Sequence, residues 1–172
     1  MVVKELNWNI AYIGFGSNIN DRLGYIRSAS SEISKNEHCK IIKFSSIYET
    51  KPYGEKKQPN FLNAVAKIET SLSVQDLFRF IKNVEKKLGR KETYKWGPRE
   101  IDLDLLFYND IVFSDENLAI PHPGIPNRDF VLTPLAEIEP VFFHPVLKQK
   151  ISDIYISESE RNIIKVSNQD IL

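Results

Sequence analysis

The chain has 172 residues, of which 42% are hydrophobic and 27% charged, and these fractions indicate a folded globular protein and exclude a collagen or a disordered chain. Its single cysteine, Cys39, excludes a disulfide framework and a cysteine-based zinc module. No apolar run reaches the roughly 18 residues that a transmembrane helix needs, and the first residues lack the apolar core of a signal peptide. We therefore expect a cytoplasmic protein with one domain, residues 1–172.

The net charge of zero hides two blocks of opposite sign. Residues 51–99 hold 12 basic and 5 acidic side chains, a net charge of +7, whereas residues 100–142 hold 1 basic and 9 acidic ones, a net charge of −8. Such blocks are compatible with two ordinary solvated faces, or with contacts to a polyanion beside metal-binding carboxylates. The charge blocks alone do not distinguish these two interpretations, and the sequence motifs are needed for that.

The first part of the chain predicts two strands on either side of a helix. Residues 10–15 are apolar and rich in strand-forming types, and a Gly-Ser-Asn cluster follows them. The apolar spacing of residues 21–34 predicts a helix, and residues 41–48 predict the second strand. The Pro and Gly residues of 50–60 then predict a loop.

Residues 61–69 give the clearest strand pattern. Small apolar residues at the even positions alternate with a second set at the odd positions, which includes Phe61 and Asn63. Because successive strand residues point to opposite faces, we expect the even set to face the core. Phe61 and Asn63 then share the opposite face.

The clearest helix follows at residues 74–88. Ser73 is the expected N-cap, and Gly89 is the expected residue just past the C-terminus. Glu85 lies inside the apolar stripe, which is unusual for an acid. Either its carboxylate reaches solvent at the end of the stripe, or a partner from outside meets it.

A basic loop at residues 90–99 leads into a fourth strand at 101–108, which we expect to turn at Asn109-Asp110 into a short partner strand at 111–113. Pro-punctuated segments with brief helical turns follow, with a weaker strand at 141–143. The order β-α-β-β-α-β-β predicts an α+β fold: a ferredoxin-like antiparallel sheet with helices packed on one face and active-site loops on the other.

The fourth strand carries the strongest chemical signal, the pair Asp102 and Asp104. Alternate residues share a face and lie about 6.5–7 Å apart along the backbone, so the two carboxylates can converge on hard cations. Magnesium fits best, since it binds through one or two carboxylates together with substrate phosphates. The pair alone is also compatible with a solvated polar face. The opposite face of this strand is expected to hold Ile101, Leu103, Leu105 and Phe107.

The run Trp96-Gly97-Pro98-Arg99 precedes this pair. Gly and Pro make a sharply shaped entry to the strand, which fixes the position of Arg99. A guanidinium beside two metal-binding carboxylates suits phosphoryl transfer, because that chemistry needs cations on the phosphate oxygens. Trp96 is compatible with a site residue or with a packed anchor.

The segment 90–105, RKETYKWGPREIDLDL, resembles the signature of the 6-hydroxymethyl-7,8-dihydropterin pyrophosphokinase family of folate biosynthesis. The pattern W-G-P-R-x-[IL]-D-[LIV]-D is far more specific than the two aspartates alone, and the resemblance covers about residues 10–145. Further blocks that agree in order are GSN at 16–18, YET at 48–50, PNFLN at 59–63, PHP at 121–123 and NRDF at 127–130.

This resemblance implies a reaction. The family transfers pyrophosphate from ATP to the hydroxymethyl oxygen of the pterin, by in-line attack on the β-phosphorus, and releases AMP. It uses two magnesium ions, for which Asp102 and Asp104 match the ligands. The resemblance also implies that Arg90 and Arg99 act with these aspartates in catalysis.

The resemblance further implies the substrate contacts. Phe61 and Phe130 match the aromatic pair that sandwiches the pterin ring, and Asn63 matches the amide that reads its edge. The implied pterin-binding residues are Thr50, Pro52, Tyr53, Phe61, Asn63 and Phe130. The implied ATP-binding residues are Lys82, Glu85, Arg90, Lys95, Trp96, Arg99, Leu105, His122 and Arg128.

The chain departs from the family pattern in the basic loop. Glu92 lies where a further arginine can occur, so a loop arginine is either missing or replaced by Lys91 or Lys95. Lysine lacks the bidentate fork of arginine. Lys82 stands where some members carry glutamine, and His122, between two prolines, is compatible with a phosphate or ribose contact or with a turn histidine.

Three other functions compete with this interpretation. A ferredoxin-like nucleic-acid-binding module is disfavoured, because net charge is zero and Asp102 with Asp104 would repel phosphates without metals. A homologue without activity is disfavoured by the intact aspartates, Arg99 and Asn63. A P-loop kinase is excluded, since no G-x-x-x-x-G-K-[ST] motif occurs. We expect a monomer that binds ATP and the pterin, without a nucleic-acid or membrane partner.

Overall fold

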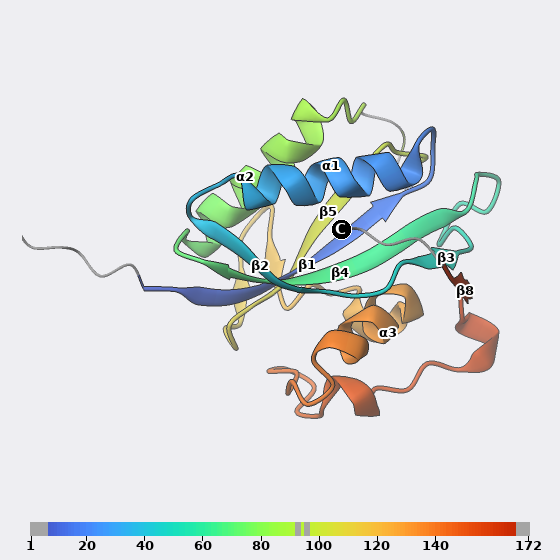
Figure 1. Cartoon of the computed structure of the whole chain (residues 1–172). Helices are drawn as coiled ribbons and strands as arrows, with labels where there is room; N and C mark the ends of the chain where they lie inside the picture. The colour runs from blue at the N-terminus through green and yellow to red at the C-terminus, as the bar shows by residue number, and fades with distance from the viewer. Residues whose placement is uncertain (1–6, 92–93, 95–96, 168–172) are drawn as a thin grey trace, which may run out of the picture.

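The computed structural model describes residues 7–91, 94 and 97–167. Within them, one antiparallel sheet of six strands has the order β5-β1-β4-β3-β8, and β2 also pairs with β4 (Figure 1). The strands of this sheet are β1 (Asn9–Ser17), β2 (Cys39–Phe44), β3 (Tyr48–Thr50), β4 (Phe61–Thr70), β5 (Asp102–Tyr108) and β8 (Ile163–Val166). The α-helices are α1 (Arg22–Ser34), α2 (Val74–Lys87) and α3 (Asp129–Ile138).

The predicted α+β class and antiparallel sheet are confirmed. Helices α1 and α2 pack side by side on one face of the sheet, over the larger hydrophobic core (Figure 1). Helix α3 lies on the other face, where the sequence predicted only brief helical turns, and it covers a second, smaller core. This second core occupies only part of that face, so the remainder stays open for a site.

Local sequence signals place the helix ends correctly. The side chain of Asp21 accepts a hydrogen bond from Gly24 N at the start of α1, and that of Ser73 accepts one from Asp76 N at the start of α2. Gly89, just past α2, has a backbone φ of +87°, a value that residues with a Cβ atom rarely adopt. The predicted caps of the second helix are confirmed.

The predicted second strand is in fact two strands, β2 and β3. The buried Ser45 lies between them, and its hydroxyl accepts the backbone N–H of Val65 at 2.9 Å. The Ser45 N–H donates in turn to the Val65 carbonyl at 2.9 Å. A side chain therefore replaces part of the backbone ladder at this point, between β2 and β3.

The prediction of a hairpin between residues 101–108 and 111–113 is wrong. Asn109 has a φ of 48°, and it exchanges two hydrogen bonds with Ile10 of β1, so the chain turns away from β5. The next strand, β6 (Phe113–Ser114), pairs with β7 (Ala119–Ile120) in a separate two-stranded sheet.

The C-terminal part also differs from the expectation. Within the described residues 141–143, only Phe143 makes a β-bridge, to Lys150, so the predicted strand is wrong. Strand β8, which the sequence did not predict, joins the sheet beside β3. Among residues 97–167, three short 3-10 turns occur, at Ile125–Asn127, Ile151–Asp153 and Glu158–Glu160.

The alternation of β5 changes face at a bulge. Ile13 of β1 pairs with Leu105 and Tyr12 pairs with Phe107, so Leu106 is an extra residue on β5. Phe107 consequently joins the α3-side core with Leu106, and not the helix-covered face on which the strict alternation had placed it. That prediction is wrong, because the extra residue reverses the pattern.

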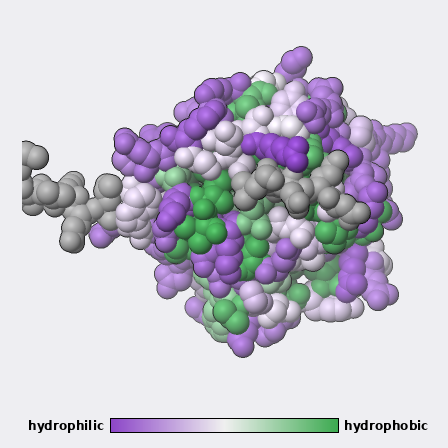
Figure 2. All heavy atoms as spheres, viewed as in Figure 1, coloured by the Kyte–Doolittle hydropathy of each residue, from purple (hydrophilic) through white to green (hydrophobic). Residues whose placement is uncertain are grey.

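The single cysteine and the molecular surface are as the composition leads us to expect. Cys39 is buried, and its thiol forms no disulfide bond. Hydrophilic residues cover most of the face in Figure 2, and apolar residues gather between them in smaller patches. No helix in the described part of the chain combines the length and the apolar character that a membrane crossing would require.

Candidate active site

Gly14 and Gly16 of β1 form the floor of the open part of the sheet. Gly16 pairs with Asn63 of β4 on one side and with Asp102 of β5 on the other. Directly opposite residues of an antiparallel pair share a face, so Asn63 and Asp102 project from the same side of the sheet with a glycine between them. A Cβ atom at Gly16 would lie 3.0 Å from Asn63 Oδ1 and 3.9 Å from Asp102 Cβ. The glycine therefore leaves the room that these two side chains use.

A pocket opens above this floor. It brings together residues from β1, β4, β5, the segment after β3 and the start of α3. The lining residues are Gly14, Phe15, Gly16, Thr50, Lys51, Tyr53, Phe61, Asn63, Ala64, Val65, Arg99, Asp102, Asp104, Leu106, Arg128, Phe130 and Val131.

One end of the pocket is aromatic. The ring centroids of Tyr53 and Phe130 lie 6.0 Å apart, and the Arg128 guanidinium carbon lies 5.3 Å from the first centroid and 5.9 Å from the second. Phe61 contributes a third, partly exposed ring from β4. A planar ring system can stack in such a place.

A neutral polar pair adjoins these rings. The side-chain amide of Asn63 donates to Thr50 Oγ1 at 2.7 Å, and both residues are buried. Thr50 of β3 pairs with Phe61 of β4 in the sheet. The register of these two strands therefore holds the Thr50 hydroxyl, the Asn63 amide and the Phe61 ring together. The amide keeps further hydrogen-bonding capacity to define the edge of a ligand.

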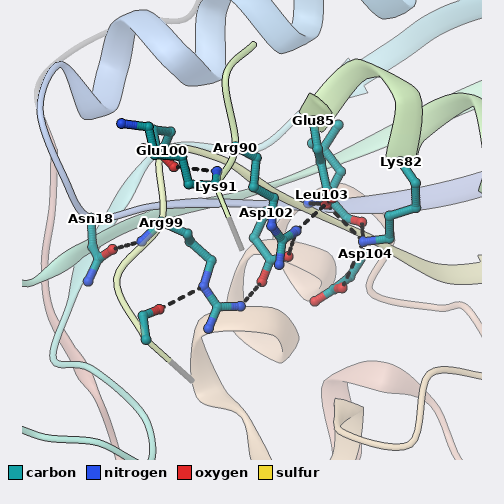
Figure 3. A network of polar contacts seen from close by, with 11 residues as sticks. Asn18, Lys82, Glu85, Arg90, Lys91, Arg99, Glu100, Asp102, Leu103 and Asp104 are labelled. Atoms are coloured by element: carbon teal, nitrogen blue, oxygen red, sulfur yellow. Dashed lines mark hydrogen bonds and ion pairs between the residues drawn. The ribbon is translucent and has the colours of Figure 1, made fainter. Parts of the chain in front are cut away.

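The other end of the pocket is ionic (Figure 3). Asp102 accepts from Arg90 at Oδ1 and from Arg99 at Oδ2, both at 2.6 Å. Burial opposes ionisation of Asp102, but the guanidinium groups of Arg99 and Arg90 and the ammonium of Lys82 hold the pKa of this carboxyl below its ordinary value. Asp104 is about one-third exposed, and its carboxylate lies 3.9 Å from Lys82 Nζ.

Glu85 joins helix α2 to this ionic end. It is buried, and its Oε1 accepts the backbone N–H of Leu103 at 2.6 Å and the ammonium of Lys82 at 2.8 Å (Figure 3). Its Oε2 lies 2.7 Å from Arg90 Nη1. Burial raises the pKa of Glu85, against the opposing charge of Lys82. The side chain therefore does not reach solvent, so that alternative is wrong, and its partners in the structure are groups of the chain itself.

His122 lies near the aspartates but outside the pocket lining. Its Nδ1 accepts the backbone N–H of Gly124 at 3.0 Å, which places the proton of the neutral ring on Nε2. Burial lowers the pKa of His122, and the Asp104 carboxylate opposes this effect. A neutral Nε2–H donor is suited to an oxygen of a ligand.

Three of the implied ATP-binding residues need separate comment. Lys95 and Trp96 lie outside the residues that the structure describes. The side chain of Leu105 is buried in the core under α1 and α2, so only its backbone is available on the pocket side. Pro52, an implied pterin-binding residue, is buried and is not among the residues that line the pocket.

The structure adds Asn18, to which the sequence gave no role. Its Oδ1 accepts the backbone N–H of Arg99 at 2.8 Å, and its Nδ2 donates to Gln58 Oε1 at 2.9 Å and to the Pro59 carbonyl at 3.1 Å. One buried amide thus joins the loop before β4 to the loop before β5. Its place in the Gly-Ser-Asn cluster was the only available signal.

The aspartates fit magnesium. They are hard oxygen donors on one face of β5, and within the described residues no group of three or more His, Cys, Asp or Glu side chains could complete a protein-only metal cage. Magnesium characteristically binds through one or two carboxylates and takes its other ligands from phosphates and water. A site of this kind therefore suits a magnesium ion that a phosphate-bearing ligand brings with it.

Comparison with known proteins gives a consistent family. Residues 12–140 match the family model for 7,8-dihydro-6-hydroxymethylpterin-pyrophosphokinase (HPPK). The 2-amino-4-hydroxy-6-hydroxymethyldihydropteridine pyrophosphokinase of Aquifex aeolicus (strain VF5) is 47% identical over 142 residues, which is 83% of this chain and 88% of that protein. The protein of the same name from Bacillus subtilis (strain 168) is 45% identical over 130 residues, 76% of this chain and 78% of that one.

The solved structure of wild-type HPPK-DHPS from Plasmodium falciparum shares the fold. It superposes with a TM-score of 0.68 at 18% sequence identity. The match covers 88% of this chain but only 45% of the solved one, so this chain spans less than half of that protein. At this identity the likeness establishes the fold alone.

Proposed function

This chain belongs to the 7,8-dihydro-6-hydroxymethylpterin-pyrophosphokinase family, and we propose that the pocket above Gly16 is where it transfers pyrophosphate. The activity is that of an ATP-dependent diphosphotransferase of folate biosynthesis, which converts 6-hydroxymethyl-7,8-dihydropterin and ATP to the pterin diphosphate and AMP. The observation that carries the assignment of the pocket is the pairing of Gly16 with both Asn63 and Asp102. It puts an amide suited to a pterin beside a carboxylate suited to a metal.

The aromatic end binds the pterin. Phe61, Phe130 and Tyr53 supply ring faces, and offset stacking of aromatic rings contributes on the order of 1 kcal/mol beyond the area that it buries. Asn63, held by Thr50, reads the edge of the pterin ring through its remaining donor and acceptor positions. Pro52 shapes the segment that carries Tyr53.

The ionic end binds the triphosphate. Arg90 and Arg99 now neutralise Asp102, and the phosphate oxygens of ATP compete with that carboxylate for the two guanidinium groups. Release of Asp102 then leaves it, with Asp104, as the ligand pair for two magnesium ions. When bound, magnesium neutralises and orients the polyphosphate. Further nucleotide contacts come from Lys82, Glu85, Lys95, Trp96, Leu105, His122 and Arg128.

The reaction is an in-line displacement. The pterin hydroxymethyl oxygen forms a bond to the β-phosphorus, the bond from that phosphorus to the bridging oxygen of AMP breaks, and the hydroxyl proton passes to solvent. Arg99 and Arg90 stabilise the charge that develops on the phosphate oxygens. The rigid floor at Gly16 keeps the two substrates in register, so positioning supplies much of the rate enhancement.

The remaining features follow the same proposal. The enzyme acts as a monomer in the cytoplasm, and residues 1–172 form one domain. Nucleic acid is not its partner, because the net charge is zero and Asp102 and Asp104 face the pocket, where they would repel a phosphate backbone.

The test is product identification. The protein is incubated with ATP, magnesium chloride and 6-hydroxymethyl-7,8-dihydropterin, and the nucleotides are separated by chromatography. We expect AMP and pterin diphosphate in equal amounts, with no AMP when the pterin is omitted. ADP as the product, or AMP formation that does not depend on the pterin, would contradict the proposal.

A further inference from the structure

We propose that Asp129 and strand β8 form a clip that holds the two walls of the pterin pocket at a fixed separation. Asp129 is then a positioning residue for pterin binding, although it does not line the pocket. The inference rests on the proposed function, since it takes Phe130 and Thr50 to be pterin-binding residues. Strand β8 lies beyond residues 12–140, the segment that matches the family model.

The carboxylate of Asp129 is almost fully buried, with the residue 4% exposed. Its Oδ2 accepts the backbone N–H groups of Asn162 at 2.7 Å and Ile163 at 2.8 Å. Its Oδ1 accepts the backbone N–H of Phe130 at 2.9 Å and the side-chain amide of Asn162 at 3.3 Å. Four N–H donors thus converge on one carboxylate, and they join the first turn of α3 to the start of β8.

Asn162 and Ile163 carry the connection to the opposite wall. The Asn162 carbonyl accepts the backbone N–H of Lys51 at 2.8 Å, and Ile163 pairs with Thr50 in the sheet. Thr50 holds the amide of Asn63. The contacts therefore run without a break from Phe130 on one wall, through Asp129 and β8, to Thr50 and Asn63 on the other.

This connection acts at the end of α3 that carries Phe130. At the other end of the helix, Glu137 already joins α3 to the Thr50 wall, since its carboxylate accepts from Ser46 N at 3.0 Å and from Tyr48 Oη at 2.8 Å. The Phe130 wall belongs to α3, whereas the Thr50 wall belongs to β3, a strand of three residues that β4 alone would otherwise pair. The ring of Phe130 faces Tyr53, three residues beyond Thr50, at a centroid separation of 6.0 Å. Stacking depends on ring separation, so a change in the gap between the walls alters pterin affinity.

A purely structural role for Asp129 makes a different prediction. An acidic residue in the first turn of a helix also stabilises that helix through its dipole. In that case its loss lowers stability and leaves the affinity of the folded protein for both substrates unchanged. The clip instead predicts a selective loss of pterin affinity, because Asp102, Asp104, Lys82 and Glu85 of the ionic end lie on β5 and α2. Arg128 is the proposed nucleotide contact that adjoins Asp129.

The experiment uses the full chain with Asp129→Asn, which replaces one acceptor oxygen by an NH₂ group that cannot accept. Asp153→Asn is the matched control, since Asp153 is an exposed carboxylate in the same C-terminal region. Binding of 6-hydroxymethyl-7,8-dihydropterin is measured by fluorescence with saturating α,β-methylene-ATP and magnesium. Binding of the nucleotide analogue is measured separately by calorimetry.

We expect the pterin Kd of Asp129→Asn to rise about tenfold, while the nucleotide Kd stays within about twofold of the wild-type value. The control should match wild type for both ligands. Equal pterin affinity of Asp129→Asn and wild type, or an equal loss for both ligands, would overturn the clip. If wild type itself binds no pterin, the proposed function fails and the clip with it.

A second variant protects the test if Asp129→Asn does not fold. Asn162→Asp places a carboxylate against that of Asp129 and repels β8, yet leaves α3 unchanged. Asn162 is outside the pocket lining, so a purely structural Asp129 predicts normal pterin affinity for this variant. The clip predicts the same selective loss as for Asp129→Asn, and normal pterin affinity would overturn it.

Discussion

Glu85 of α2 accepts the backbone N–H of Leu103 in β5 at 2.6 Å. In the described part of the chain β5 is an edge strand, so this N–H has no partner strand there on its outer side. The carbonyl of the same residue accepts a hydrogen bond from Lys82 Nζ at 2.6 Å. Two side chains of one helix thus satisfy both backbone groups of the residue between Asp102 and Asp104. The helix fixes the part of the strand that presents the aspartates.

Glu85→Gln should destabilise the protein and lower its activity. The amide oxygen of Gln can still accept the hydrogen bond from Leu103 N. The neutral amide no longer balances the positive charges of Lys82 and Arg90, which contact this buried position. We expect the free energy of unfolding, measured by urea denaturation, to fall by about 1–3 kcal/mol. Glu116→Gln, at an exposed turn, is the control and should match wild type. Equal stability of the two variants would show that the buried contacts contribute nothing.

Asp104→Asn should abolish most turnover with the fold intact. Asp104 is partly exposed and makes one long ion pair, so its replacement disturbs little structure but removes a metal ligand of the proposed site. We expect kcat to fall by more than about a hundredfold, and Mn²⁺ binding with α,β-methylene-ATP to weaken in parallel. Asp110→Asn, in the exposed turn after β5, is the control. Near-normal turnover of Asp104→Asn would remove it from the metal site.

Gly124→Ala should act through Arg128. An added Cβ would lie 2.6 Å from Arg128 Cζ, so the guanidinium has to shift from its present position near Tyr53 and Phe130. The backbone φ of Gly124 is −79°, which alanine adopts readily, so stability should change by less than about 1 kcal/mol. We expect affinity for α,β-methylene-ATP, measured by calorimetry, to fall about five- to tenfold.

A double-mutant cycle checks this route. If the effect passes through the guanidinium, Gly124→Ala should cause no further loss of nucleotide affinity in an Arg128→Ala background. Additive losses would mean that the alanine acts on the pocket by another route.

The pair formed by Glu139 and Lys67 should give the fold an acid-sensitive contact between the end of α3 and β4. The ammonium of Lys67, with a smaller contribution from Tyr12, lowers the pKa of Glu139 below its ordinary value of 4.5. A lowered folded-state pKa means that this stabilisation is complete above about pH 4.5 and is lost as the pH falls through the folded-state value.

The midpoint of unfolding is measured at a series of pH values between about 3 and 7. As the pH falls toward the acid end, this midpoint should decrease more steeply for wild type than for Glu139→Gln. Glu158→Gln, at an exposed position, should retain the wild-type slope. Parallel curves for wild type and Glu139→Gln would contradict the assignment.

Local patterns in the sequence determined much of the fold and the chemical identity of the site. The period of two in residues 61–69 placed Phe61 and Asn63 on one face, and the alternation at Asp102 and Asp104 placed two carboxylates on one face. Both follow from the geometry of a single strand, which needs no knowledge of its neighbours. The family signature added the substrates, which periodicity alone cannot supply.

Contacts between distant segments decided the rest. The register of β1 against β4 and β5 put Gly16 between Asn63 and Asp102, and a bulge at Leu106, which no local pattern displays, put Phe107 into the core under α3. The buried Glu85 looked anomalous in its own helix, because its partners lie on β5 and in the loop before it. Strand register and burial are settled by the packing of the whole chain, so the sequence determined which groups face one way along each strand, and only the tertiary structure decided which of them meet.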